Sequence, residues 1–135
     1  MGNTMVNYSY NNVRIVKSIN GINPYNLEYL GDESSPNFGL WNLDVDFILG
    51  IGDNFLREKI YNLIIKNGRK VISLMNLTAS ISSSAKIGDG VFINRNVTIN
   101  TFAKIGSNVI LNTGCIVEHE CEIHDNVHIA SGAVL

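Results

Sequence analysis

The sequence predicts a left-handed parallel β-helix of hexapeptide repeats in residues 75–135, preceded by a small α/β, Rossmann-like segment. Two observations predict the β-helix: an aliphatic residue recurs at every sixth position, and a small or β-branched residue follows each of them four places later. A third observation, a change of hydrophobic period before residue 75, predicts the α/β segment. The fold class therefore follows from periodicity alone.

The hexapeptide pattern runs without a gap through the second half of the chain. Its aliphatic positions are Ile81, Ile87, Ile93, Ile99, Ile105, Leu111, Val117, Ile123, Ile129 and Leu135. Its small positions are Ala85, Val91, Val97, Ala103, Val109, Cys115, Cys121, Val127 and Ala133, and Met75 and Ala79 extend the series upstream. A small residue and the next aliphatic residue are two apart, so both face inward on a short strand. The three residues between strands include turn-formers such as Asp89-Gly90, Ser107-Asn108 and Asp125-Asn126. Three strands and three corners make a triangular coil of about 18 residues, whose repeat class is the left-handed exception among parallel connections.

Before residue 75 the pattern changes to that of alternating strands and helices. The expected elements are a helix at 12–19, a strand at 26–30, a loop at 33–40, a buried strand at 44–51, a helix at 55–65 and a strand at 70–74. The apolar face of the longer helix is expected to hold Phe55, Ile60, Leu63 and Ile64. The last three elements form a βαβ unit, which predicts a small parallel sheet.

Composition and charge exclude several classes of protein. The chain of 135 residues is 45% hydrophobic and 16% charged, with a net charge of −2 and no cluster of Lys and Arg, which argues against a nucleic-acid partner. No apolar stretch approaches the length of a membrane span, and the N-terminus lacks the pattern of a signal peptide. Cys115 and Cys121 occupy inward positions of one coil, so we expect two reduced thiols without a disulfide, in a cytoplasmic protein.

All three histidines fall within ten residues of one another, at positions 119 to 128. The repeat places Glu118, His119 and Glu120 at the three corner positions of one unit, exposed on a single prism and covered where prisms pack side by side. A histidine there can act as a general base, and Glu120 can hold one of its ring nitrogens. A surface histidine flanked by charged residues would have the same local sequence.

Two motifs, in this order and joined to the β-helix, give the chain a family resemblance. They are Asp46-Phe47-Ile48…Ile51-Gly52-Asp53-Asn54…Arg57…Ile60-Tyr61 and Asn112-Thr113-Gly114…Val117-Glu118-His119-Glu120-Cys121. From about residue 44 onward the chain resembles the sugar O- and N-acetyltransferases of the sialic acid O-acetyltransferase type. It is especially similar to the acetyl-CoA-dependent enzymes that acetylate UDP-4-amino-sugars in bacillosamine synthesis.

The resemblance implies a bacterial acetyltransferase of glycan biosynthesis, with acetyl-CoA as co-substrate. The acetyl group would pass to the amine or hydroxyl of a nucleotide-activated or sialic-acid-like sugar. Residues 1–74 would form the nucleotide-sugar-binding-like domain and residues 75–135 the acyltransferase domain. His119 would be the general base, supported by Glu120, and transfer would be direct, without a metal or a covalent enzyme intermediate.

The same resemblance implies where the two substrates lie. His128 and Asn112 would line the acetyl-CoA and active-site cleft between neighbouring subunits of a homotrimer. Gly52 and Asp32 would lie beside the nucleotide-sugar. The sugar itself, and the choice between nitrogen and oxygen as acceptor, do not follow from these residues.

The chain departs from the family pattern in several respects. Residues 7–12 contain no glycine where the family has a glycine-rich loop for the nucleotide. His124 stands where the family usually has Gly, and the chain stops at Leu135, on the first residue of a hexapeptide. We therefore expect either a fragment or a degraded relative that lacks the coils clasping the pantetheine arm of CoA.

Three alternatives stay open. One is a purely structural β-helix without activity, and another is an acetyltransferase for a simpler acceptor. The third is a zinc enzyme of the γ-carbonic anhydrase kind, because His119 and His124 have the required spacing of five. Its third ligand is missing two coils upstream, at residues 81–84, unless His128 takes that place.

Overall fold

The computed structural model describes residues 31–33, 35 and 37–135, which belong to two units. The first unit ends at Asp44, and the second runs from Val45 to Leu135. The glycine-free segment 7–12, the expected helix at 12–19 and the expected strand at 26–30 lie outside the described residues. The Rossmann-like character of the N-terminal part therefore stays a prediction.

The described part of the first unit contains a short 3-10 helix. This helix, η3 (Gly39–Asn42), begins after Phe38 and ends with the Leu43 N–H donating to the Leu40 carbonyl at 3.1 Å. The ring of Phe38 packs edge-on against Trp41, with ring centroids 4.9 Å apart. The predicted loop at 33–40 therefore ends at Phe38, two residues earlier than expected.

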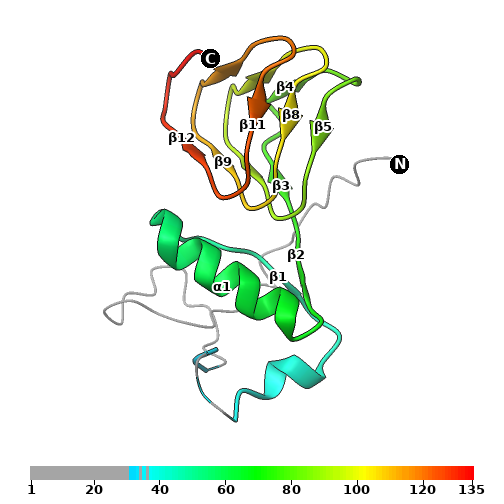
Figure 1. The fold of residues 1–135 in the computed structure, drawn as a ribbon, viewed down its shortest axis with the longest axis vertical. Coiled ribbons are helices and arrows are strands. Elements are labelled where there is room, and N and C mark those ends of the chain that lie inside the picture. Colours follow the sequence, from blue (N-terminus) through cyan, green and yellow to red (C-terminus); the bar gives the residue numbers. More distant parts are fainter. Residues whose placement is uncertain (1–30, 34, 36) are drawn as a thin grey trace. The chain divides into compact units, whose positions relative to one another are not determined.

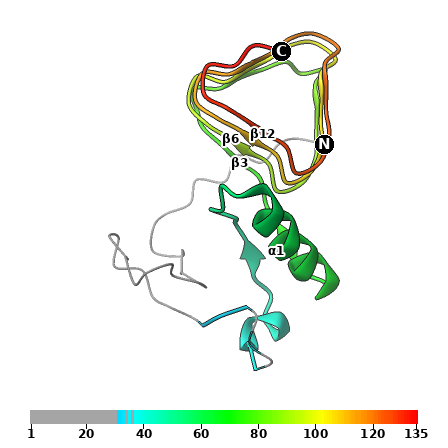
Figure 2. The ribbon, with the colours of Figure 1, turned by 60° about the vertical axis from the view of Figure 1, so that its left-hand side comes forward.

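The second half of the chain is a parallel β-solenoid of two-residue strands. In chain order these are β3 (Leu74–Met75), β4 (Ser80–Ile81), β5 (Lys86–Ile87), β6 (Phe92–Ile93), β7 (Thr98–Ile99), β8 (Lys104–Ile105), β9 (Ile110–Leu111), β10 (Ile116–Val117), β11 (Glu122–Ile123) and β12 (His128–Ile129). They form three parallel sheets, ordered β12-β9-β6-β3, β10-β7-β4 and β11-β8-β5 (Figure 1). Figure 2 shows the three sheets as the sides of a triangle. This solenoid fits the left-handed β-helix that the hexapeptide pattern predicts.

The register stacks identical repeat positions above one another. Met75 pairs with Ile93, Ile93 with Leu111, and Leu111 with Ile129, each 18 residues on. Stacking of this kind gives every inward side chain a like neighbour on the next coil. The interior of the triangle is therefore a column of aliphatic side chains.

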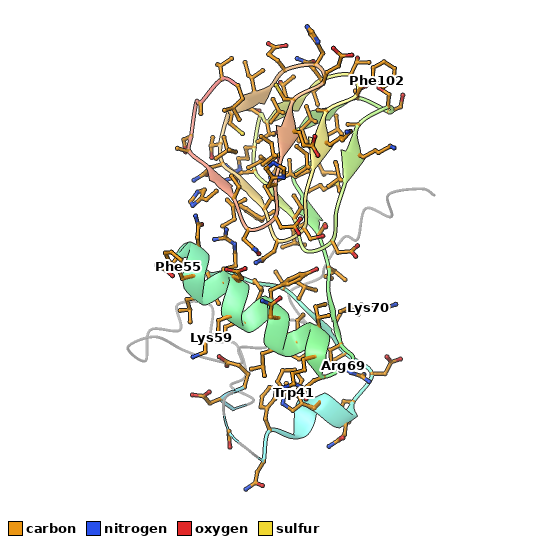
Figure 3. The ribbon with its side chains drawn as sticks, in the orientation of Figure 1. Trp41, Phe55, Lys59, Arg69, Lys70 and Phe102 are labelled. Carbon is orange, nitrogen blue, oxygen red and sulfur yellow. The ribbon has the colours of Figure 1, made fainter. Side chains whose placement is uncertain are left out.

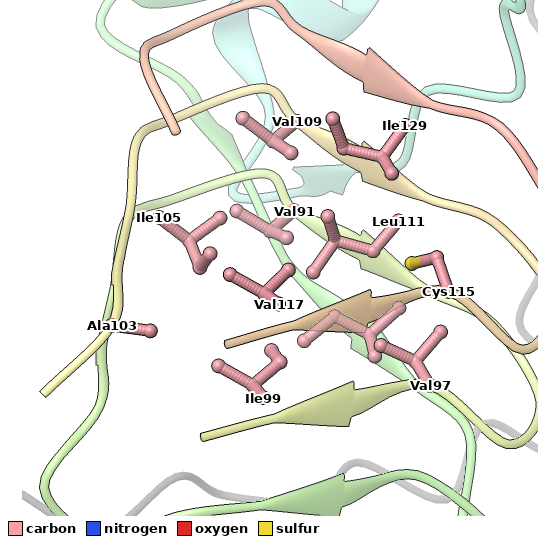
Figure 4. Packing of buried hydrophobic residues seen from close by; sticks show 11 residues of the cluster. Val91, Val97, Ile99, Ala103, Ile105, Val109, Leu111, Cys115, Val117 and Ile129 are labelled. Carbon is pink, nitrogen blue, oxygen red and sulfur yellow. The ribbon is translucent and has the colours of Figure 1, made fainter. Parts of the chain in front are cut away.

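The predicted inward positions form the core. Its fully buried members include Val91, Ile93, Val97, Ile99, Ala103, Val109, Leu111, Cys115 and Val117, whose side chains converge in Figure 4. Burying a side chain of this size contributes about 1.5–3 kcal/mol. Both cysteines are free, as expected: Cys121 is half-buried against the core, and burial raises the pKa of the Cys115 thiol. Cys115 thus packs as a small hydrophobic residue.

The corners of the triangle are β-turns with a positive φ at their third residue. In the turn that starts at Asn112, the Cys115 N–H donates to the Asn112 carbonyl at 3.1 Å, and Gly114 has φ +68°. The same conformation recurs at every sixth residue: Gly90, Asn96, Phe102, Asn108, Gly114, Glu120, Asn126 and Gly132. Gly and Asn suit this conformation because they tolerate positive φ.

A βαβ unit precedes the solenoid, as predicted, but its strands are short. β1 (Asp46–Phe47) pairs in parallel with β2 (Lys70–Val71), and α1 (Asn54–Lys66) connects them. The strand predicted at 44–51 is therefore only two residues long. The strand predicted at 70–74 splits, because its last residue belongs to β3 and pairs with β6 instead.

The predicted apolar face of α1 is confirmed at Ile60 and Ile64 but is wrong at Phe55. Arg57, Ile60 and Ile64 are buried, whereas Phe55 is 85% exposed. Phe55 is only two residues before Arg57, so the two side chains lie on different sides of the helix. Since the side with Arg57 packs against the solenoid, Phe55 is left exposed. In the described part of the chain, no helix has the length and apolarity needed to cross a membrane.

Replacing Gly90 with alanine should destabilise the protein more than replacing Gly114 with alanine. Both glycines have positive φ, +67° and +68°, where alanine costs about 1–2 kcal/mol. A Cβ at Gly90 would in addition lie 3.0 Å from Val71 Cγ1 and 3.1 Å from Tyr61 Cε2, whereas Gly114 has nothing within 4 Å. Urea unfolding of the two variants measures the difference. Equal losses would show that α1 and β2 move aside without penalty.

Candidate functional site

The buried guanidinium of Arg57 joins α1 to the solenoid. Arg57 is 1% exposed, and all its donor nitrogens are bound. Its acceptors are Asn108 O (from Nε, 3.1 Å), Ile51 O and Gly52 O (from Nη1, both 3.2 Å), and Asn54 Oδ1 and Asn126 O (from Nη2, 2.9 and 2.7 Å). Burial lowers the pKa of Arg57, and the nearby Asp53 carboxylate opposes that shift. One side chain thus fixes both the loop before the helix and two stacked turns on one corner of the solenoid.

The two stacked turns that Arg57 binds form a ladder of amide side chains. Asn108 is fully buried and donates through Nδ2 to Asn126 Oδ1 at 2.7 Å. Asn126 in turn donates through Nδ2 to Glu58 Oε1 at 3.0 Å. A second helix residue therefore reaches the same corner, which makes the position of α1 on the solenoid specific.

A shallow depression of about 420 Å³ lies where the N-terminus of α1 meets the solenoid. Its lining residues are Gly52, Asp53, Asn54 and Phe55 on the helix side and His128 and Ala130 on the solenoid side. The Asp53 carboxylate caps α1 by accepting from the Leu56 N–H at 2.8 Å. The structure thus brings together Gly52 and His128, which the sequence assigned to the nucleotide-sugar and to acetyl-CoA.

Asn112 adjoins this depression through His128. Its Oδ1 accepts from Asn94 Nδ2 at 3.0 Å and from the Thr113 N–H at 2.8 Å. These bonds turn the Asn112 amide nitrogen toward His128 Nε2, which is 3.5 Å away. A fixed polar pair, Asn112 and His128, therefore stands on the solenoid beside α1.

His119 and Glu120 lie on the corner between β10 and β11. The His119 Nδ1 and Glu120 Oε2 are 3.6 Å apart, and each side chain is 74% exposed. Next to them, Glu118 Oε2 accepts from Asn100 Nδ2 at 2.8 Å. The two residues predicted to act as base and supporting carboxylate are thus neighbours, on a corner open to a partner or ligand.

One chain does not bring His119 and His128 together. The corner that carries His119 joins the sheets of β10 and β11, whereas His128 belongs to β12, on the third sheet. In a triangle, that corner lies opposite the third side (Figure 2). The second unit therefore carries two separate groups of predicted site residues.

Asp32, the remaining predicted site residue, belongs to the first unit. It is half-buried, and its carbonyl accepts from the Ser35 N–H at 3.0 Å. Its assignment to the nucleotide-sugar stays a prediction.

The three histidines point to different sides of the coil. His119 and His124 stand on successive corners and His128 on a strand. Among the residues that the structure describes, no three His, Cys, Asp or Glu side chains are grouped to hold a metal ion.

The sequence analysis assigned no structural role to Arg57, although its position on the helix indicates one. Arg57 stands three and seven residues before Ile60 and Ile64, so a cation occupies the apolar face of the helix. Such a cation needs buried acceptors, which the solenoid corners provide.

Residues 84–119 and 102–135 match the family described as bacterial transferase hexapeptide (six repeats). A histidine-substituted perosamine N-acetyltransferase from Caulobacter crescentus, solved with CoA and GDP-perosamine, is similar with 27% identity and a TM-score of 0.68, over 80% of this chain and 54% of that one.

Two further solved structures are similar. The acetyltransferase domain of PglB from Neisseria gonorrhoeae, in complex with acetyl coenzyme A, has 28% identity and a TM-score of 0.72, over 90% of this chain and 56% of that one. WeeI from Acinetobacter baumannii, with 20% identity and a TM-score of 0.79 over 95% and 60%, supports the fold. The chain thus spans little more than half the length of these proteins, and the predicted resemblance to hexapeptide-repeat sugar acetyltransferases is confirmed.

Replacing Arg57 with methionine should lower the free energy of unfolding by about 3 kcal/mol or more, because each buried acceptor left unpaired costs about 1–3 kcal/mol. Arg57→Lys should recover only part of this loss, since an ammonium lacks the planar fork of donors. Lys59→Met, on the exposed side of α1, is the matched control and should stay within about 0.5 kcal/mol. Denaturant unfolding followed by circular dichroism measures all three. An Arg57→Met loss as small as that of the control would contradict this role.

Proposed function

Since residues 84–135 carry the hexapeptide repeat of bacterial transferases, we propose that this chain acts in an acetyl-CoA-dependent sugar acetyltransferase. The acetyl group passes from CoA to the amine of a nucleotide-activated sugar. The observation that carries the proposal is the depression in which Gly52 meets His128, with Asn112 beside it. Similar proteins solved with CoA, acetyl coenzyme A and GDP-perosamine support both substrates.

The two substrates are assigned to different parts of the chain. The loop before α1, at Gly52, contacts the nucleotide-sugar. Residues 75–135 hold acetyl-CoA, with His128 and Asn112 in contact with it. The N-terminus of α1 at Gly52 then delivers the sugar to the solenoid, because Arg57 fixes that loop against the corners.

His119 is the general base of the proposed reaction. It accepts a proton from the sugar amine as the nitrogen attacks the thioester carbonyl, so that a C–N bond forms. The C–S bond then breaks, and the CoA thiolate leaves and is protonated. Glu120, 3.6 Å from Nδ1, orients the imidazole and balances its charge once it is protonated. The Asn112 amide nitrogen is a candidate donor to the oxyanion that develops on the carbonyl.

A complete site requires two copies of the chain. The His119 corner lies opposite the side of the triangle that holds His128, so one chain cannot place both on one substrate. In a homotrimer with three-fold symmetry, the corner of each copy faces the β12 side of the next. The proposed active site therefore lies between copies, with His119 from one and His128 from another.

His119→Ala should lower kcat/KM about 10²- to 10⁴-fold in a thiol-release assay with acetyl-CoA and GDP-perosamine. Glu120→Gln should cause a smaller loss, because the His119 imidazole keeps a polar neighbour, although that neighbour no longer carries a negative charge. His124→Ala, on the next corner, is the matched control and should keep full activity. If His119→Ala is as active as the unaltered chain, His119 is not the base. If His124→Ala is as inactive as His119→Ala, a metal ligand role becomes the better explanation.

Mixing two inactive variants tests whether the site is shared. His119→Ala and His128→Ala homo-oligomers should each be nearly inactive. When the two chains are co-expressed in equal amounts, about a quarter of the random interfaces join an intact His119 to an intact His128, so about a quarter of the activity should return. Activity of the mixed preparation is compared with that of each variant alone. No recovery, despite mixed oligomers in native mass spectra, would mean that both histidines act within one chain.

A further inference from the structure

The corner that carries His119 differs from the other corners in the residues that adopt a positive φ. Of the eight positions with positive φ in the solenoid, six hold Gly or Asn. The two exceptions are Phe102, with φ +61°, and Glu120, also with φ +61°. They are 18 residues apart and so lie directly above one another on one corner.

The conformation of Phe102 is unfavourable for its residue type. A bulky side chain in the left-handed region costs about 1–2 kcal/mol. The backbone itself is held in place, because the Phe102 N–H donates to Ser84 Oγ at 3.2 Å on the coil below. Asn or Gly would fit that turn without strain, so the fold alone does not account for a phenylalanine.

Burial within the chain does not compensate for this cost. Phe102 is 61% exposed and lies at the outer edge of the solenoid (Figure 3). The corner around it is otherwise polar: Ser82, Ser83, Ser84, Asn100, Thr101, Glu118, His119 and Glu120. Phe102 is therefore a single aromatic ring among hydrogen-bonding groups.

The position of Phe102 places it beside the proposed base. Glu120 lies one coil above it, and adjacent coils of a parallel sheet are about 4.8 Å apart. His119 is next to Glu120, with 3.6 Å between their facing atoms. A ligand that lies on the Phe102 ring is thus within reach of the His119 imidazole.

We propose that Phe102 binds the acceptor sugar, and this rests on the proposed function. The apolar C–H face of the sugar ring lies on the phenyl ring, and its hydroxyl groups meet the polar side chains of the corner. This contact holds the acceptor amine toward His119. An aromatic surface with polar groups at its rim suits a sugar, which has an apolar face and polar edges.

Direct packing of the Phe102 ring against a neighbouring copy explains it less well than a ligand held between the copies does. The centre of a protein interface is apolar and depleted of charge. Here the aromatic ring has no apolar neighbour on its own corner, and Glu118, His119 and Glu120 stand above it. The lone ring is better matched to one small ligand than to a protein surface.

The test combines acceptor kinetics with stability in the full chain. Phe102→Asn should raise KM for GDP-perosamine about tenfold and leave KM for acetyl-CoA unchanged. The same substitution should raise Tm, because Asn tolerates positive φ. Phe102→Tyr should restore the acceptor KM, since it keeps the aromatic face. The matched control is Asn96→Gly, at the equivalent position of the preceding unit, and should change neither KM.

The outcomes separate this inference from the proposed function. An unchanged acceptor KM in Phe102→Asn, in an enzyme that His119→Ala inactivates, overturns the role of Phe102 and leaves the proposed function intact. A rise in both KM values together with smaller oligomers in sedimentation shows a contact between copies and also overturns it. Weaker binding of GDP-perosamine to Phe102→Asn in calorimetry, with unchanged binding of CoA, supports it. Full activity of His119→Ala overturns the proposed function instead.

Discussion

The arrangement of the second unit depends on one buried cation, the guanidinium of Arg57. A charged group removed from water is tolerated only when every donor is paired, and Arg57 meets this condition with backbone carbonyls from its own loop and from two stacked turns on one solenoid corner. The planar fork of arginine suits acceptors that lie in several directions at once. The contact therefore does more than hold α1 in place. It sets the loop at Gly52 at a fixed distance from His128, and so determines where the depression lies.

The solenoid could be predicted from the sequence because each inward position is decided by the residues 18 before and after it, which obey the same period. Leu111 and Cys115 are buried for the reason that the repeat gives. The face of α1 could be predicted only in part: Ile60 and Ile64 are buried as expected, whereas Phe55 is exposed and Arg57 is buried. The apolar periodicity of the helix predicts a buried Phe55 and an exposed Arg57. Burial of Arg57 depends on the carbonyls of Asn108 and Asn126, which are far along the chain and accept its hydrogen bonds. The strand predicted at 70–74 is split for a related reason: Lys70 and Val71 pair with β1, whereas Leu74 pairs with β6 of the solenoid.

Distance along the sequence is a poor guide to the candidate site. His119 and His128 are nine residues apart, half a coil, which carries the chain from a corner to the opposite side of the triangle. Gly52 and His128 are far apart in sequence, yet line one depression. The solenoid thus places the histidines on different sides of the triangle, and in the proposed reaction each side supplies part of the site. A fold of this kind can assemble a reaction centre by repeating itself around an axis, without any chain containing the whole centre.

The same regularity makes departures from it informative. Because each corner repeats one turn, the residue expected at its third position is known in advance, and Gly or Asn meets that expectation at six of eight places. A residue that is costly at such a place persists only if something outside the turn compensates. Glu120 and Phe102 are the two costly residues, and they share the corner of His119. Selection for stability alone would have placed Asn or Gly at both positions, as it has at the corners that contact α1. That two strained residues are stacked beside one exposed histidine is therefore an argument for function that depends on backbone geometry, independently of any resemblance to other proteins.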